Sequence, residues 1–232
     1  MVTIIIIAAG DESRWKSYLG VSKHFIEIEG EQLLPRIVRL FKKYNPSSNI
    51  YVVGKTEDYK IKDSTWYLPK LNPKFGDADK FISSMKLWSM SERTIVVYGD
   101  VWFSEDAVKQ ISEYKDKDWI LFGRFGKNKL TGGDGGECFA QSFYPEGIEE
   151  HHNSLNKIVT AYKHKLLKRN GGWEHYRAMI GFAICPYHIE AGRFYQIEDW
   201  TDDFDSPEDY NQWIKARKKW KKNQNTKKLN KK

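Results

Sequence analysis

Runs of apolar residues alternate along the first half of the chain with segments whose apolar positions recur every three to four residues. Four short, continuously apolar runs predict buried strands: residues 2–9, 49–53, 94–98 and 119–122. Three longer segments have the apolar spacing of helices: residues 32–44, 79–90 and 104–114. Strands that alternate with helices form parallel sheets with crossover helices, so the pattern predicts an α/β domain with a mostly parallel sheet.

Weaker patterns predict the remaining elements. Short strands are expected at residues 24–28, 66–68, 138–143, 182–185 and 194–197. Residues 149–168 predict another helix, which Gly171-Gly172 terminates. Ser206-Pro207-Glu208-Asp209 predicts a helix start, with a capping Ser and an Asp that completes a capping box. The less regular second half therefore predicts a small lobe beside the sheet.

The polar loop after the first strand lies at the carboxyl end of that strand, where parallel sheets bind ligands. It begins with Ala8-Ala9-Gly10, and the lack of large side chains there lets a nucleotide approach the backbone amides closely. Arg14 and Lys23 in the same loop are cations suited to polyphosphate. The alternative for this segment is a tight turn with two surface cations.

Acidic residues follow apolar segments at two distant points of the chain. Asp100 follows Gly99 at the end of a predicted strand, where a carboxylate can hold Mg²⁺ or, alternatively, cap a turn. Asp203 and Asp205 alternate around Phe204, so both acids lie on one side of an extended segment while Phe204 turns to the core. Asp205 can instead cap the helix that follows it.

Together these segments resemble the nucleotidyltransferase family with the glycosyltransferase-A type fold, whose members make nucleotide sugars, cytidyl-alditols and the molybdopterin dinucleotide. That family has a strand followed by A-A-G-x-G-x-R, then P-K, a strand-end G-D, and D-x-D-[ST]-P-E-D near the C-terminus. The counterparts here span residues 2–210: Ala8-Ala9-Gly10, Arg14, Ser22-Lys23, Gly99-Asp100 and Asp203-Phe204-Asp205-Ser206-Pro207-Glu208-Asp209. The resemblance implies a Rossmann-like, mostly parallel sheet flanked by helices, with a small irregular acceptor lobe.

The resemblance also implies an activity and roles for individual residues. The activity is transfer of a nucleotidyl group from an NTP to a sugar phosphate or similar phosphorylated acceptor, with release of pyrophosphate. Asp100 and Asp205 would hold Mg²⁺ or Mn²⁺, and Arg14, Lys23 and Asp100 are the candidate catalytic residues. The candidate nucleotide-binding residues are Ala8, Ala9, Gly10, Arg14, Lys23 and Gly76.

The same resemblance gives the expected organisation of the chain. Residues 1–214 would form one nucleotidyltransferase-like α/β domain, and 215–232 a basic C-terminal helix or tail. Within the domain, residues 1–123 would be the nucleotide-binding half and 124–200 the acceptor side.

Two positions depart from the family pattern and keep other functions open. Glu12 replaces the second glycine of the loop, and Ser22 replaces the proline before Lys23. An acid near the phosphates favours a glycosyltransferase that moves a sugar from a nucleotide sugar to an acceptor, including a modified base in DNA. Against that alternative, Asp100-Val101-Trp102 lacks the two-acid D-x-D that is usual in metal-dependent glycosyltransferases. A degenerate family member that only binds nucleotide or polyanion is the third hypothesis.

The positive charge of the chain lies almost entirely at its C-terminal end. The net charge is +7, from 38 basic and 31 acidic residues. Residues 215–232 hold ten of the basic residues and no acid, which leaves 28 basic and 31 acidic residues, or −3, in the rest. Such a block is either a solubilising tail or a contact for a polyanion such as a nucleic acid.

Other features indicate a reducing compartment and ordinary packing. Cys138 and Cys185 are expected as buried free thiols, and the first apolar run is too short to span a membrane, so we expect a cytoplasmic protein. The adjacent His151 and His152 point to different faces of a helix start and predict no metal site. The Gly-rich segment 129–137 predicts either a mobile lid over an acceptor or a hairpin turn. The cluster around Trp173 predicts packing or, alternatively, a sugar or base contact.

Overall fold

A seven-stranded sheet forms the centre of the molecule in the computed structural model, which describes residues 1–115, 118–133, 135–181 and 189–229. Its strands are β1 (Val2–Ile7), β4 (Asn49–Val53), β5 (Thr65–Tyr67), β6 (Arg93–Tyr98), β8 (Trp119–Arg124), β9 (Glu137–Phe143) and β10 (Phe194–Gln196). They lie in the order β10-β8-β9-β6-β1-β4-β5. Only β9 runs antiparallel to its neighbours, so the sheet is mostly parallel, as predicted.

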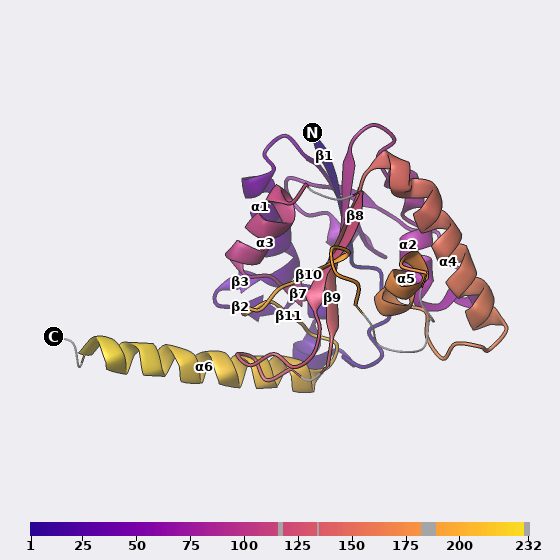
Figure 1. The fold of residues 1–232 in the computed structure, drawn as a ribbon. Helices are drawn as coiled ribbons and strands as arrows, with labels where there is room; N and C mark the ends of the chain where they lie inside the picture. Colours follow the sequence, from indigo (N-terminus) through magenta and orange to yellow (C-terminus); the bar gives the residue numbers. More distant parts are fainter. Residues whose placement is uncertain (116–117, 134, 182–188, 230–232) are drawn as a thin grey trace.

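Helices cover both faces of this sheet (Figure 1). The helices are α1 (Leu33–Tyr44), α2 (Asp79–Ile82), α3 (Glu105–Glu113), α4 (Ile148–Lys163), α5 (Gly172–Met179) and α6 (Pro207–Leu229). The pair α1 and α3 packs on one face, and α2, α4 and α5 pack on the other, as Figure 1 shows. The central strand β1 is buried from both sides, since Ile4, Ile5 and Ile6 are fully buried. This explains why its sequence is apolar without alternation.

Two short ribbons flank the main sheet. β2 (Glu27–Ile28) pairs with β3 (Glu31–Gln32), directly before α1. β7 (Val101–Trp102) pairs antiparallel with β11 (Asp202–Asp203), which brings a late segment of the chain beside the end of β6. From there α6 begins, and Ser206 and Asp209 form the predicted capping box: the Ser206 backbone N–H donates to Asp209 Oδ2 (2.9 Å) and the Asp209 backbone N–H donates to Ser206 Oγ (3.3 Å).

Some expected elements have different extents in the structure. The helix expected over 79–90 is wrong beyond Ile82: a short 3-10 turn at Met85–Leu87 follows it. The hydroxyls of Ser83 and Ser84 donate to the carbonyls of Lys80 and Phe81, and such local bonds compete with helix continuation. α4 ends at Lys163, five residues before the expected end.

The C-terminal part is helical beyond the expected boundary. α6 continues from the α/β body through position 215 to Leu229, so the boundary between domain and tail at 214 falls inside one helix. The strand expected at 182–185, including Cys185, lies outside the described residues, whereas Cys138 is a free thiol. Among the helices of the described chain, none combines the length and the apolar character needed to cross a bilayer.

Candidate nucleotide and metal site

The loop after β1 is fixed by a buried tryptophan. Trp15 is fully buried, and its indole N–H donates to the backbone carbonyl of Val21 (2.9 Å), which closes the loop on itself. Of the three small residues, Ala8 uses its backbone N–H in the sheet by donating to Val53 (2.9 Å). Ala9 and Gly10 instead line an open pocket. The backbone available to a ligand therefore begins one residue later than the sequence indicates.

Glu12 turns back into its own loop. Its carboxylate accepts a hydrogen bond from Ser22 Oγ (2.6 Å) and lies 3.0 Å from Nδ1 of the buried His24. The phenolic oxygen of Tyr59 also lies 3.0 Å from this ring nitrogen. Burial raises the pKa of Glu12, but the hydrogen bonds from His24 and Ser22 outweigh it and lower the pKa to about 2. The acid that departs from the family pattern thus ties the loop to the segment that carries Lys23.

Asp100 reaches the site because β6 ends very close to β1. A Cβ atom on Gly99 would lie only 2.9 Å from the Cβ atom of Ala8 and from the carbonyl oxygen of Ile7, so only glycine fits between the strand ends. Its backbone N–H donates to the same Ile7 carbonyl (2.9 Å). The following residue, Asp100, therefore projects from the carboxyl edge of the sheet beside the loop after β1.

Asp205 reaches the same edge through the β7–β11 ribbon. Asp203 pairs with Val101 across the ribbon, and the Phe204 N–H donates to the Asp100 carbonyl (3.1 Å). Phe204 is fully buried, as predicted from the alternation of the acids around it. The ribbon thus holds two residues that are more than one hundred positions apart in the sequence next to each other.

Four charged side chains meet at this edge. Lys23 Nζ lies 2.6 Å from Asp100 Oδ2 and 3.3 Å from Asp205 Oδ1, and Arg14 Nη2 lies 2.5 Å from Asp205 Oδ2. The Lys23 side chain is 5% exposed, whereas the Arg14 side chain is 67% exposed. The two acids converge opposite the two loop cations, as the sequence predicted.

Burial and neighbouring charges shift the pKa values of this cluster in opposite directions. Burial lowers the pKa of Lys23, but the carboxylates of Asp100 and Asp205 outweigh it and raise the pKa above its usual range. Burial likewise raises the pKa of Asp100, but the Lys23 ammonium outweighs it and holds the pKa below its usual range. Lys23 and Asp100 therefore stay charged at neutral pH, and Lys23 cannot serve as a proton acceptor there.

A pocket of about 360 Å³ lies on one side of this cluster. Ala9 and Gly10 line one wall, and Gly76 lines another, so three of the six predicted nucleotide-binding residues meet there. Arg14 and Lys23 do not line it and belong to the adjoining charged cluster. The cations of the pocket are Lys55, Lys80, Lys168 and Arg169.

Gly76 joins the pocket to the second half of the chain. It has a φ of +60°, and an added Cβ would lie 2.5 Å from Oδ1 of the buried Asn170. Asn170 in turn donates to the Phe75 carbonyl (2.7 Å). The segment between α4 and α5, which carries Lys168 and Arg169, is thereby held over the pocket.

Asp100 and Asp205 are the residues that could hold a divalent cation. Within the described ranges, no group of three or more His, Cys, Asp or Glu side chains is arranged as a metal site. Two carboxylates that converge on one ammonium nevertheless fit Mg²⁺, which binds one or two carboxylates and completes its shell with water and substrate phosphates.

Sequence reasoning missed the pocket cations and the acid Glu137. Lys55 follows Gly54 at the carboxyl end of β4, so the rule that placed Gly10 and Asp100 could also have found it. Lys168 and Arg169 had no such signal, because their place depends on the packing of α4 and α5. Glu137 and Asp203 lie beyond Asp205, where they line a separate polar cavity of about 130 Å³.

The other sequence predictions concern packing. His151 is fully buried in the first turns of α4, with Nδ1 3.3 Å from Nε2 of His175, while His152 is exposed, so the two side chains point to different faces as predicted. The cluster around Trp173 is buried in α5, which confirms packing over a ligand contact. The Gly-rich segment joins β8 to β9 as a hairpin connection.

Comparisons with known proteins agree with this architecture. No family model and no curated protein matches the chain. A solved structure of a putative glucose-1-phosphate thymidylyltransferase from Bacillus anthracis superimposes with a TM-score of 0.59 at 13% identity, covering 94% of this chain and 96% of that one. The chain has a nucleotidyltransferase fold of the glycosyltransferase-A type.

Two further solved structures support the same fold. The 4-diphosphocytidyl-2C-methyl-D-erythritol synthase from Anaerococcus prevotii has a TM-score of 0.55 at 14% identity, covering 95% of this chain and 98% of that one. The CTP:phosphocholine cytidylyltransferase from Streptococcus pneumoniae has a TM-score of 0.53 at 13% identity, covering 90% and 96%. At these identities the nucleotidyltransferase fold is shared along nearly the whole length of each chain.

Proposed function

We propose that this protein transfers a nucleotidyl group from an NTP to a phosphorylated acceptor such as a sugar phosphate. The observation that carries the proposal is the convergence of Asp100 and Asp205 on Lys23, at the strand edge where this fold class binds ligands. A pocket lined by four cations and three acids adjoins that cluster, and its cations can contact a triphosphate. The named activities of the structural neighbours, which act on glucose-1-phosphate and phosphocholine, point to the same class of acceptor.

The reaction needs no covalent intermediate on the protein. A phosphate oxygen of the acceptor attacks the α-phosphorus of the NTP, a new P–O bond forms, and the bond between the α-phosphorus and the bridging oxygen breaks. That oxygen leaves with its electron pair on pyrophosphate. The protein's task is therefore to align the two phosphates and to stabilise the negative charge that develops on the leaving group.

The residues of the site suit this task. Asp100 and Asp205 would hold Mg²⁺, which draws acceptor and NTP phosphates together and neutralises part of their charge. Arg14 is mostly exposed beside Asp205, so its planar guanidinium can reach a polyphosphate that enters the site. Lys23 supplies a permanent positive charge in a buried position. We assign the NTP to the pocket beside Ala9, Gly10 and Gly76.

The glycosyltransferase alternative rested on an acid near the phosphates. In the structure the Glu12 carboxylate hydrogen-bonds within its own loop and does not line the pocket. That observation removes the charge argument for a nucleotide diphosphate sugar as donor, so we prefer nucleotidyl transfer.

Pyrophosphate release tests the proposal. The protein is incubated in Mg²⁺ with each of the four common NTPs and a set of sugar phosphates, and pyrophosphate is measured. Asp100→Asn and Asp205→Asn are each expected to lower kcat about 10²–10³-fold, because each removes one charge of a preorganised site. Chelation of the divalent cation is expected to abolish turnover.

Asp63→Asn serves as the matched control, because Asp63 is an exposed acid away from the site whose positive φ asparagine tolerates. The control is expected to turn over like the parent. Near-normal activity of both site variants in Mg²⁺ would refute the assignment of the metal. Release of a nucleoside diphosphate together with a glycosylated acceptor would instead show glycosyl transfer, and nucleotide binding without any product would indicate a binding protein.

A further inference from the structure

The helix α6 extends beyond the α/β body, and the proposed transfer reaction gives it no role. Figure 1 shows it running away from the sheet and its covering helices. Only its beginning is embedded: Trp213 is 1% exposed, and its indole N–H donates to the Trp200 carbonyl (2.9 Å). This anchor fixes the rotation of the helix, so each later position has a defined face.

Two cations lie on the side of α6 that faces the body. Arg217 Nε lies 2.9 Å from Glu29 Oε1, and Lys221 Nζ lies 2.7 Å from the same oxygen. The Arg217 guanidinium also lies over the Trp200 ring (4.8 Å) and the Trp220 ring (5.1 Å). Positions 217 and 221 are one helical turn apart, so they mark a single inward face.

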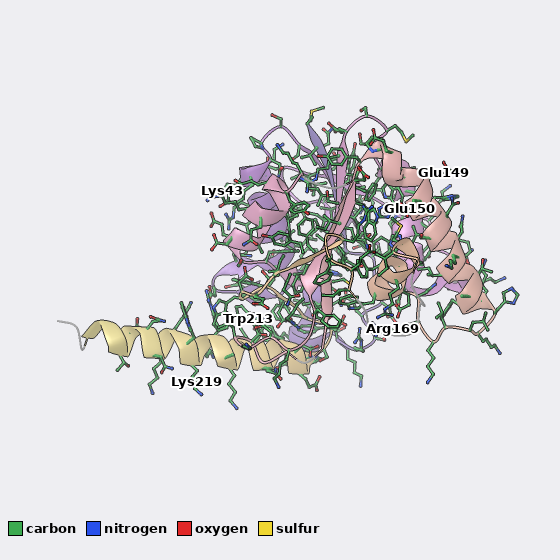
Figure 2. The ribbon with its side chains drawn as sticks, in the orientation of Figure 1. Lys43, Glu149, Glu150, Arg169, Trp213 and Lys219 are labelled. Atoms are coloured by element: carbon green, nitrogen blue, oxygen red, sulfur yellow. The ribbon has the colours of Figure 1, made fainter. Side chains whose placement is uncertain are left out.

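The opposite face carries four lysines along its middle stretch. Lys215, Lys218, Lys219 and Lys222 follow the i, i+3, i+4, i+7 spacing of one helix face, and all four are exposed. No acid follows Asp209 in the sequence, and none of these four lysines forms an ion pair with any described residue. Figure 2 labels Lys219 on the stretch of α6 that has left the body. We call these four residues the lysine stripe.

The lysine stripe is electrostatically unfavourable on its own. Like charges at i, i+3 and i, i+4 each destabilise a helix by a few tenths of a kcal/mol, as opposite charges stabilise it. Between Trp213 and Thr226, the described side chains of α6 form no continuous apolar face that would offset this by packing, and Trp220 is their one large exposed hydrophobic residue. An anionic partner would convert the repulsion into attraction.

We propose that the lysine stripe binds the phosphodiester backbone of a nucleic acid. Regularly spaced phosphates match a row of cations that spans about 10 Å along a helix, at 1.5 Å per residue. A membrane surface fits less well, because helices that bind there bury an apolar face of Trp, Phe and Leu residues. A helix-binding groove on a protein requires the same kind of face.

Fluorescence anisotropy of the full-length protein with a labelled DNA duplex of about 20 base pairs tests this, at salt concentrations from about 50 to 200 mM. Four phosphate contacts predict a log–log salt slope near −4 and an affinity loss of about 10²-fold across this range. The variant K215Q/K218Q/K219Q/K222Q is expected to lose most of this affinity and most of the slope. Its helix content and melting temperature are expected not to fall, since the four side chains are exposed and the substitutions remove their mutual repulsion.

The matched control, K62Q/K109Q/K129Q/K157Q, removes the same charge from exposed lysines of the body. The control is expected to bind DNA like the parent protein. Equal weakening in the control would overturn the proposal, because net charge alone would then explain binding. So would tighter binding to phosphatidylserine vesicles than to the duplex, unchanged DNA binding by the stripe variant, or a dimer in light scattering that the stripe variant dissociates.

Discussion

Lys23 is the residue on which the charges of the site converge. A buried ammonium is stable only when carboxylates replace its lost hydration, and here Asp100 and Asp205 do so together. Because its pKa is raised above the usual range, Lys23 keeps its proton at neutral and moderately alkaline pH. Its contribution to a reaction is therefore a fixed positive charge.

Glu137 differs from Asp100 and Asp205 because it is half-buried and forms no ion pair with any described residue. Burial, and then the nearby Asp205, raise its pKa from 4.5 to about 8 although Arg124 lowers it. Between these pH values the folded protein binds one proton more than the unfolded chain at this residue. The stability that it contributes is complete below pH 4.5 and is lost as the pH rises through 8.

We therefore expect Glu137→Gln to flatten the stability profile at alkaline pH. Between about pH 7 and pH 9, above the range in which the buried histidines affect stability, the melting temperature of the parent protein should fall, and that of the variant should fall less. Circular dichroism melts across this range measure the effect. Glu113→Gln, at an exposed position on α3, is the control and should follow the parent. Parallel profiles for Glu137→Gln and the parent would contradict the assignment.

At the scale of elements, the β7–β11 ribbon determines whether the acids meet. Phe204 is its core residue and is fully buried. Its ring centroid lies 5.7 Å from that of Tyr210 and 5.9 Å from that of Trp213. A smaller side chain there would leave space beneath the ribbon, and Asp205 next to it would lose its fixed position.

Phe204→Leu is expected to lower stability by roughly 1–2 kcal/mol, toward the low end of large-to-small core substitutions. It should lower nucleotidyl transfer more than the exposed substitution Phe125→Leu, which serves as control because Phe125 is 41% exposed. Urea unfolding at 25 °C tests the expected loss of stability, and pyrophosphate release at 25 °C tests the expected loss of activity. Full activity of Phe204→Leu would mean that the ribbon does not position Asp205.

The strands were predictable from the sequence because their burial on both faces leaves continuous apolar runs, as in β1 and β6. The end of α2 was not predictable from the sequence. The hydroxyls of Ser83 and Ser84 donate to preceding carbonyls, and apolar spacing does not reveal these hydrogen bonds. The length of α6 was also missed, since its lysines indicate a solvated tail as readily as a helix. Helical structure there depends on the anchor that Trp213 provides.

The same division holds for the site. The charged cluster was predictable because its residues follow recognisable strand ends and occur in the order of the family motifs. Its members are Arg14, Lys23, Asp100 and Asp205. Lys168 and Arg169 were not predictable, because α4 and α5 place them over the pocket through tertiary packing alone. The engagement of Glu12 with Ser22 and His24 likewise depends on the path of the loop, which spacing does not determine.

At the scale of the whole molecule, the helices on the α2, α4 and α5 face of the sheet contain a buried pair of histidines. His151 on α4 and His175 on α5 lie where the two helices meet. The ring centroid of Phe143 lies 4.2 Å from that of His151, and the ring centroid of Phe81 lies 5.6 Å from that of His175. Burial lowers the pKa of His175 to about 3, and it lowers that of His151 well below 6.5. Below pH 6.5 the unfolded chain binds more protons than the folded one, so stability falls as the medium becomes acidic.

We expect unfolding free energy to fall by ~1 kcal/mol per pH unit for each of these histidines below pH 6.5. His151→Phe should remove about half of this acid sensitivity, because an uncharged ring replaces one titrating group. His152→Phe is the control, since the adjacent His152 side chain is exposed. Urea unfolding at several pH values measures the slopes, and equal slopes for both variants would contradict the expectation.

The pairing of β7 with β11 has a consequence for biosynthesis. A chain emerging from the ribosome can build β1, β4 and β6 long before residue 205 has been made, because domains form from the N-terminal side as they are translated. Until residue 205 has been made, Asp100 and Lys23 face each other without their second acid. The proposed metal site would therefore be completed only after residue 205 has been made, and shorter nascent chains would lack one of its two carboxylates.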